Sequence, residues 1–117
     1  MKTLLALALM FHSACFAQWT PEQKTLAAIY GAAWVVDWKQ TTEMTRRTAT
    51  HHEMNPLLSR YPSRQEVNRY FLVMPIVTFL VLDNIKSEHR TLALSVLTAM
   101  EVGLVAHNYS VGMRVQF

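Results

Sequence analysis

The chain has 117 residues, 51% of them hydrophobic, and a formal net charge of +3, which bounds it to one domain and does not point to a nucleic-acid partner. Its one cysteine is Cys15, so residues after it cannot form a disulfide framework, although exported domains of this size usually have one. We therefore expect stabilisation by a lipid bilayer rather than by a large water-excluded core.

The first 17 residues have the layout of a cleavable secretory signal peptide. Lys2 gives a positive start, an apolar run extends from Leu4 to Phe11, and Cys15-Phe16-Ala17 precedes a cut ahead of Gln18. Residues 18–117 then form a mature helical membrane domain of about 100 residues. Two alternatives are open, which are lipid attachment at Cys15 and retention of the segment as a fourth helix.

The mature chain predicts an all-α bundle of three transmembrane helices, the first at about 21–44. Thr20 is its N-cap, Pro21 its first position and Gln23 the third residue of a capping box. Such a helix is about 36 Å long at ~1.5 Å per residue, enough to cross the hydrocarbon core of a bilayer. Trp19 and Trp38 fall where aromatic anchors occur, at the two interfaces.

The second helix is expected at about 64–85. A Ser-x-x-Glu capping box, Ser63 to Glu66, opens it. The apolar run from Tyr70 to Leu82 is the best candidate span of the chain. Pro75 lies inside it and should kink it, which membrane helices tolerate.

The third helix is expected at about 88–108, with Ser87 as its cap. Because the preceding connection is short, the second and third helices should be antiparallel neighbours. Residues 109–117 alternate between apolar and polar and end on Phe117, as the closing strand of an outer-membrane barrel does. One such segment cannot make a barrel, so we expect a short extended tail.

Basic residues gather between the first and second apolar stretches. The positive-inside bias places such a loop in the cytoplasm, which agrees with an exported mature N-terminus. The predicted location is therefore the bacterial inner membrane, with the outer membrane as a weaker alternative. The residues are Lys39, Arg46, Arg47, Arg60, Arg64 and Arg69.

Polar side chains on the membrane helices form a predicted polar cluster, because ionisable groups in such helices usually face a bundle interior or a partner. Glu101 lies mid-helix among apolar residues and shares a helical face with Asn108. The full set comprises Asp37, Gln40, Thr41, Glu53, Asn55, Glu101, His107 and Asn108.

A metal site is a second interpretation of these groups. His51, Glu53 and His107 are ligand types for zinc or another divalent ion, although their spacing matches no helical ligand motif. In the alternative interpretation no cofactor binds, and the side chains of Glu53 and Asn55 only hold the loop against the helix ends.

Two motifs give the chain a family resemblance. Asp37 and Thr41 form an Asp-x-x-x-Thr helix, and Glu53 to Pro56 form a Glu-x-Asn-Pro loop. The chain resembles small multi-helix membrane proteins of unknown function from bacteria and their phages. It departs from them at Leu58-Ser59, where a glycine is expected. The resemblance implies a membrane location and a polar core, and it implies no reaction.

These observations leave three functions open. The first is a structural or partner-binding membrane protein that contacts the lipid bilayer and a second copy or another membrane protein. The second is a membrane-embedded metal-dependent enzyme that uses Asp37, His51, Glu53 and His107. The third is a phage-type protein that perturbs membranes by oligomerisation.

Overall fold

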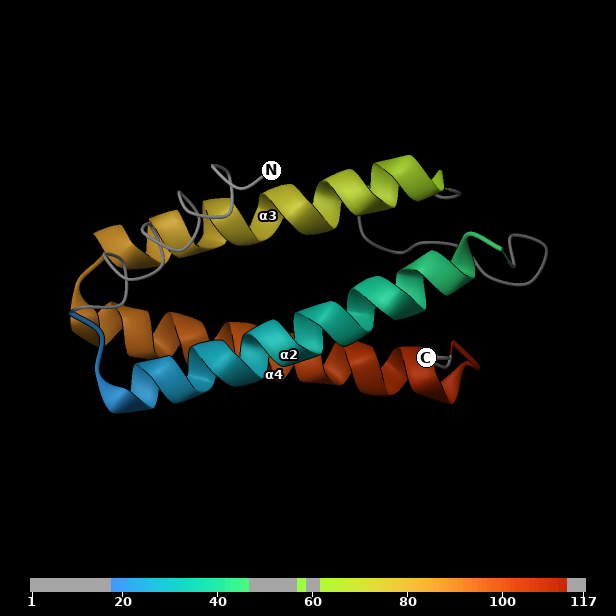
Figure 1. The fold of residues 1–117 in the computed structure, drawn as a ribbon. Coiled ribbons are helices and arrows are strands. Elements are labelled where there is room, and N and C mark those ends of the chain that lie inside the picture. The colour runs from blue at the N-terminus through green and yellow to red at the C-terminus, as the bar shows by residue number, and fades with distance from the viewer. Residues whose placement is uncertain (1–17, 47–56, 59–61, 114–117) are drawn as a thin grey trace.

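The computed structural model describes residues 18–46, 57–58 and 62–113, which form three helices and no strand. They are α2 (Pro21–Met44), α3 (Arg64–Asn84) and α4 (Ser87–Ser110). The chain runs in the same direction along α2 and α4 and in the opposite direction along α3 (Figure 1). The expected all-α bundle of three helices is confirmed, and the proposed signal segment, residues 1–17, lies outside the described part of the chain.

The N-terminal caps of α2 and α3 agree with the sequence. Thr20 Oγ1 accepts a hydrogen bond from the Gln23 backbone N–H at 3.2 Å, and the Thr20 N–H donates to Gln23 Oε1 at 3.1 Å. Ser63 Oγ accepts from the Glu66 N–H at 3.1 Å. These side chains satisfy backbone donors that have no partner within the helix, and so they fix both helix starts.

The ends of α4 differ from the prediction. Lys86 occupies the N-cap position without a side-chain hydrogen bond, and Ser87 is the first helical residue, so the expected Ser87 cap is wrong. The helix also continues through Tyr109 and Ser110, which were expected in an extended tail.

A glycine-based C-cap explains where α4 stops. Gly112 has a positive φ of 91°, which costs a glycine little. Its N–H donates to Tyr109 O at 3.1 Å, and the Met113 N–H donates to Asn108 O at 2.9 Å. This pair of bonds is the Schellman motif, which satisfies the last carbonyls of a helix.

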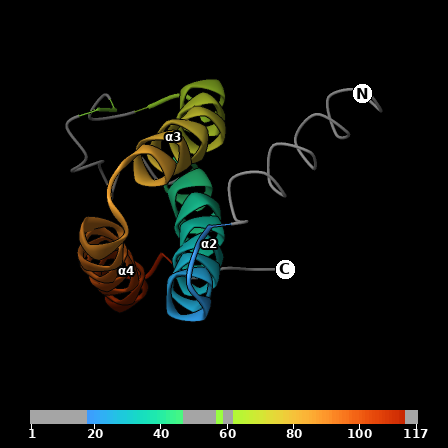
Figure 2. The same cartoon turned by 90° about the vertical axis from the view of Figure 1, so that its left-hand side faces the viewer.

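Helix α2 is the centre of the bundle (Figure 2). It packs along the length of α4, makes a smaller contact with α3, and leaves α3 and α4 touching each other least. The two helices joined by the short turn are thus antiparallel as predicted, but they diverge from each other. A turn fixes only where two helices begin to run together, whereas side-chain packing sets how far they stay in contact.

The contact between α2 and α4 recurs along α4 at a regular spacing of four and three residues, the repeat of packed helix pairs. We call this contact the α2–α4 seam. It includes Gln23, Ala27, Asp37 and Gln40 from α2, and Ser87, Thr91, Leu94, Thr98, Glu101, Val105 and Asn108 from α4.

An indole ring of α2 compensates for the proline inside α3. Pro75 has no N–H, so the carbonyl of Phe71, four residues earlier, has no intrahelical donor. The Trp34 Nε1–H donates to this oxygen at 3.0 Å, in a buried position. The neighbouring helix therefore supplies the hydrogen bond that the proline removes.

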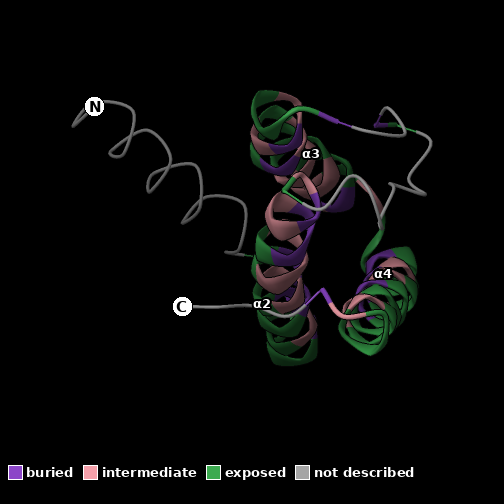
Figure 3. Ribbon diagram, turned by 90° about the vertical axis from the view of Figure 1, so that its right-hand side faces the viewer, coloured by how far each residue is buried: buried purple, intermediate pink, exposed green. Residues whose placement is uncertain are grey.

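On α4 the distribution of polarity differs from that of a helix in a water-soluble bundle. The buried residues of α4 are Arg90, Leu94, Thr98 and Glu101, whereas large apolar side chains lie on its outer surface, where Leu92 is 65% and Met100 61% exposed. Figure 3 shows the exposed surface of α4 on the side turned away from α2. Both α3 and α4 are long and apolar enough to cross a membrane.

Candidate functional site

The C-terminal half of the α2–α4 seam holds a group of hydrogen-bonded polar side chains. Asn108 Nδ2 donates to Asp37 Oδ1 at 2.7 Å and to Gln40 Oε1 at 3.2 Å. Gln40 Nε2 donates to the Val105 carbonyl at 3.1 Å, and Thr41 Oγ1 donates to Asp37 Oδ1 at 3.5 Å. At this end of the bundle, amide and carboxyl groups therefore join α2 to α4.

Glu101 adds a second carboxyl group to these residues. It is 5% exposed, and its carboxyl lies in contact with that of Asp37. Its Oε1 atom is buried and has no hydrogen-bond partner. We call Asp37, Gln40, Thr41, Glu101 and Asn108 the carboxyl cluster.

The other residues of the predicted polar cluster are placed differently. The His107 side chain is exposed on α4, and its backbone carbonyl accepts the Val111 N–H at 3.1 Å. His51, Glu53 and Asn55 lie outside the described residues. Within residues 18–46, 57–58 and 62–113, no three His, Cys, Asp or Glu side chains are grouped for a metal.

A second group of polar side chains, absent from the predicted polar cluster, lies at the opposite end of the seam. Gln23 is fully buried, and its Nε2 donates to Ser87 O, Ser87 Oγ and Thr91 Oγ1 at 2.9, 2.9 and 3.0 Å. Its Oε1 accepts the Thr20 N–H and also Arg90 Nη1 at 3.4 Å. This amide joins the start of α2 to the start of α4.

Arg90 completes this group by capping the end of α3. Its Nε donates to Leu82 O at 2.7 Å, and its Nη2 donates to Asp83 O at 3.3 Å and to Ile85 O at 3.0 Å. The guanidinium also stacks over the Trp19 ring, 5.2 Å from the centroid. A cation at a helix C-terminus is favoured by the unpaired carbonyls and the helix dipole. We call Gln23, Ser87, Arg90 and Thr91 the arginine cluster.

A signal for the arginine cluster was present in the sequence. Residues seven positions apart lie on the same face of a helix. One such series starts at Gln23 and ends at Met44, and a second starts at Ser87 and ends at Asn108. Comparing the two faces pairs Gln23 with Ser87 and Asp37 with Glu101. Periodicity calculated for apolar residues alone misses a face on which polar residues recur.

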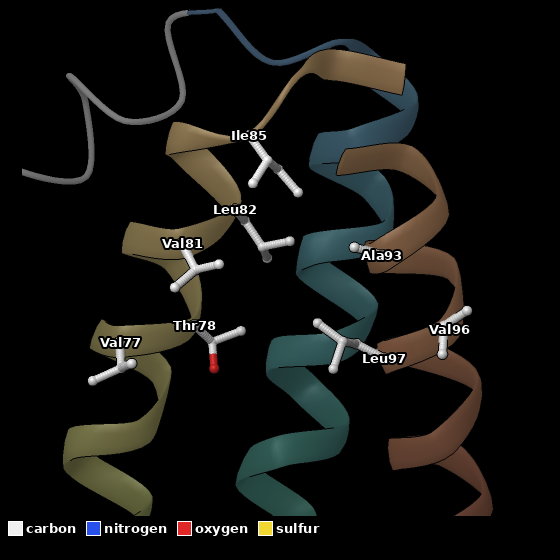
Figure 4. Close-up of a pocket in the computed structure, with 8 residues that line it drawn as sticks. All are labelled: Val77, Thr78, Val81, Leu82, Ile85, Ala93, Val96 and Leu97. Atoms are coloured by element: carbon white, nitrogen blue, oxygen red, sulfur yellow. The ribbon is translucent and has the colours of Figure 1, made fainter. Parts of the chain in front are cut away.

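An apolar groove of about 490 Å³ separates α3 from α4 (Figure 4). Val77, Val81, Ala93 and Val96 contribute to its walls, and Thr78 is its one polar lining residue. The groove contains no carboxyl, amine, imidazole or thiol group for acid–base or nucleophilic chemistry.

Comparison of the chain with protein-family models, with curated proteins and with solved structures finds no match. The protein class therefore has to be inferred from the bundle itself. The described residues define a small all-α bundle that has an apolar exterior on α3 and α4 and polar clusters at two levels of its interior.

Proposed function

We propose that the chain is a small integral protein of the bacterial inner membrane with a structural or partner-binding role. The observation that supports this most is the reversed polarity of α4, which buries Arg90 and Glu101 and exposes Leu92 and Met100. Such an exterior is unfavourable in water, where a large contiguous apolar surface promotes association. In a bilayer the same exterior meets lipid tails, and the polar residues hold the helices together.

The groove between α3 and α4 is consistent with this environment. Open apolar walls lose dispersion contacts when nothing fills the space between them. Lipid tails have the shape and chemistry to fill it, so the divergence of α3 from α4 is less costly in a membrane than in water.

Membrane integration is tested by alkaline extraction of membranes from cells that express the chain. A protein held by transmembrane helices stays in the pellet at high pH, whereas a peripheral protein is released. We expect full retention. Release of the folded chain into the soluble fraction would contradict the proposal.

The orientation is tested by cysteine labelling in a Cys15→Ser background. Gln65 and Glu88 are exposed residues at the starts of α3 and α4, and they lie at opposite ends of the bundle because the helices are antiparallel. The positive-inside bias of Arg46, Arg64 and Arg69 predicts that a membrane-impermeant reagent labels Glu88→Cys in intact cells and leaves Gln65→Cys unlabelled. Labelling of Gln65→Cys alone would show that the protein has the opposite orientation in the membrane.

The two parts of the proposed role are distinguished by photo-crosslinking in the membrane. A photoreactive residue at Met100, on the outer surface of α4, gives a protein adduct of defined mass if the chain binds a partner there. It gives only lipid adducts if the role is structural at that surface.

A further inference from the structure

The carboxyl cluster contains a buried charge problem that its own hydrogen bonds do not solve. The carboxyl groups of Asp37 and Glu101 are in contact, and like charges at such a separation repel strongly where water is excluded. Within the described residues no Lys, Arg or His forms an ion pair with Glu101. A proton or a bound cation is needed to hold the pair together.

The unpartnered oxygen of Glu101 favours the cation. A proton shared between the two carboxyl groups occupies one oxygen of Glu101 and leaves Oε1 buried without a partner. Buried polar atoms without partners are rare and costly. A cation is able to bind both oxygens of one carboxylate, and so it accounts for the atom that a proton does not.

The surrounding residues supply a third oxygen in a fixed position. Gln40 is 1% exposed, and its Nε2 is held by the Val105 carbonyl. This bond turns Gln40 Oε1 toward the cluster, where Asn108 Nδ2 bridges it to Asp37 Oδ1. Asn108 thereby holds an amide oxygen and a carboxylate oxygen side by side.

We propose that Asp37, Glu101 and Gln40 form a binding site for an oxygen-preferring divalent cation of the magnesium, calcium or manganese type. All three donors are hard oxygen ligands, which these ions prefer to sulfur or imidazole. Two carboxylates and one divalent ion make a neutral group, the form that costs least to bury. Cation binding is a property in addition to the proposed membrane role, and it does not depend on which partner the protein binds.

The proposal is tested by thermal unfolding of the purified full-length protein in mild detergent. The protein is first treated with a chelator and then exposed separately to MgCl₂, CaCl₂, MnCl₂ or, at matched ionic strength, NaCl. We expect at least one divalent chloride to raise the Tm by on the order of 10 °C at a hundred-fold excess over its Kd, and NaCl to leave it unchanged. Absence of a shift with every divalent ion would overturn the site.

Two variants locate the effect. Glu101→Gln removes one carboxylate and should abolish the shift, whereas the control Glu88→Gln changes an exposed carboxyl of the same helix and should keep it. An equal shift in the wild-type protein and Glu101→Gln would overturn the assignment.

A direct binding measurement covers the case in which Glu101→Gln does not fold. Equilibrium dialysis of the wild-type protein with the stabilising cation should give about one bound ion per chain. The proposal would be overturned if no ion is bound and the Tm rises only as the pH is lowered. These two results would indicate that a shared proton, and not a cation, holds the carboxyl groups together.

Discussion

The two polar clusters of the α2–α4 seam use similar groups but differ in how completely these groups are satisfied. In the arginine cluster, both ends of the Gln23 amide have partners, and Arg90 donates to three backbone carbonyls. In the carboxyl cluster, Glu101 Oε1 has no partner and the second carboxyl group lies against it. The first is complete with the protein's own atoms, whereas the second is not.

This difference separates a structural role from a binding role. A buried network with all its groups paired fixes the register of the helices and has no capacity for a ligand. A network that leaves a buried carboxylate oxygen unpaired is unfavourable by itself, and it becomes favourable when an added group completes it. Substitutions in the two clusters should therefore have effects of opposite sign in the absence of cations.

The largest effect is expected for Arg90→Ala. The substitution removes the donors of Leu82 O, Asp83 O and Ile85 O at the end of α3, and hydrogen bonds from a charged donor contribute more than neutral ones. We expect the free energy of unfolding to fall by about 3 kcal/mol, measured by reversible unfolding in mixed micelles. Arg64→Ala, at the exposed start of α3, is the control and should change it by less than about 0.5 kcal/mol. Equal losses in the two variants would contradict the capping role.

A smaller loss is expected for Gln23→Leu. Leucine has a similar length and leaves Ser87 Oγ, Thr91 Oγ1 and the Thr20 N–H without the amide. The expected decrease in the free energy of unfolding is about 2 kcal/mol. The matched control is Gln65→Leu, an exposed glutamine in the first turn of α3. A neutral Gln23→Leu variant would show that the arginine cluster does not need its amide.

The opposite sign is expected for Glu101→Gln in the presence of a chelator. Glutamine removes one of two carboxyl groups in contact and supplies an N–H donor to Asp37. The free energy of unfolding should rise by about 1 kcal/mol, and the difference should disappear or reverse when a stabilising divalent cation is added to both proteins. Destabilisation of the variant under chelation would place Glu101 among the structural groups.

Local sequence signals predicted much of the fold. Thr20, Pro21 and Gln23 set the start of α2, and Ser63 sets the start of α3, because caps act within one turn of a helix. The alternation after residue 108 predicts an extended tail, whereas α4 continues to Ser110. Its end is set by Gly112, which adopts a positive φ and allows the C-cap.

Tertiary features were predicted less well. Asp37, Gln40, Thr41 and Asn108 all belong to the predicted polar cluster, but the hydrogen bonds that join them across α2 and α4 were not predicted. The exposure of His107 and the burial of Arg90 were not predictable from spacing alone, because both depend on how α4 is rotated against α2. That rotation is set by side-chain packing between residues more than 60 positions apart.

The smallest effect is expected midway between the two clusters. Thr98 is 8% exposed, and its Oγ1 donates to the Leu26 carbonyl at 3.3 Å. This is a single hydrogen bond, and its acceptor is a backbone carbonyl inside α2. Thr98→Val keeps the shape of the side chain and removes only this donor. The expected decrease in the free energy of unfolding is about 0.6 kcal/mol, a typical value for an interhelical hydrogen bond within a bilayer.

Ser95→Ala is the control, because Ser95 Oγ donates within α4 to Thr91 O and the substitution should not affect helix association. A loss for Thr98→Val as large as that for Gln23→Leu would mean that polar contacts along the whole seam stabilise it equally, and the distinction between two end clusters and an apolar middle would then fail.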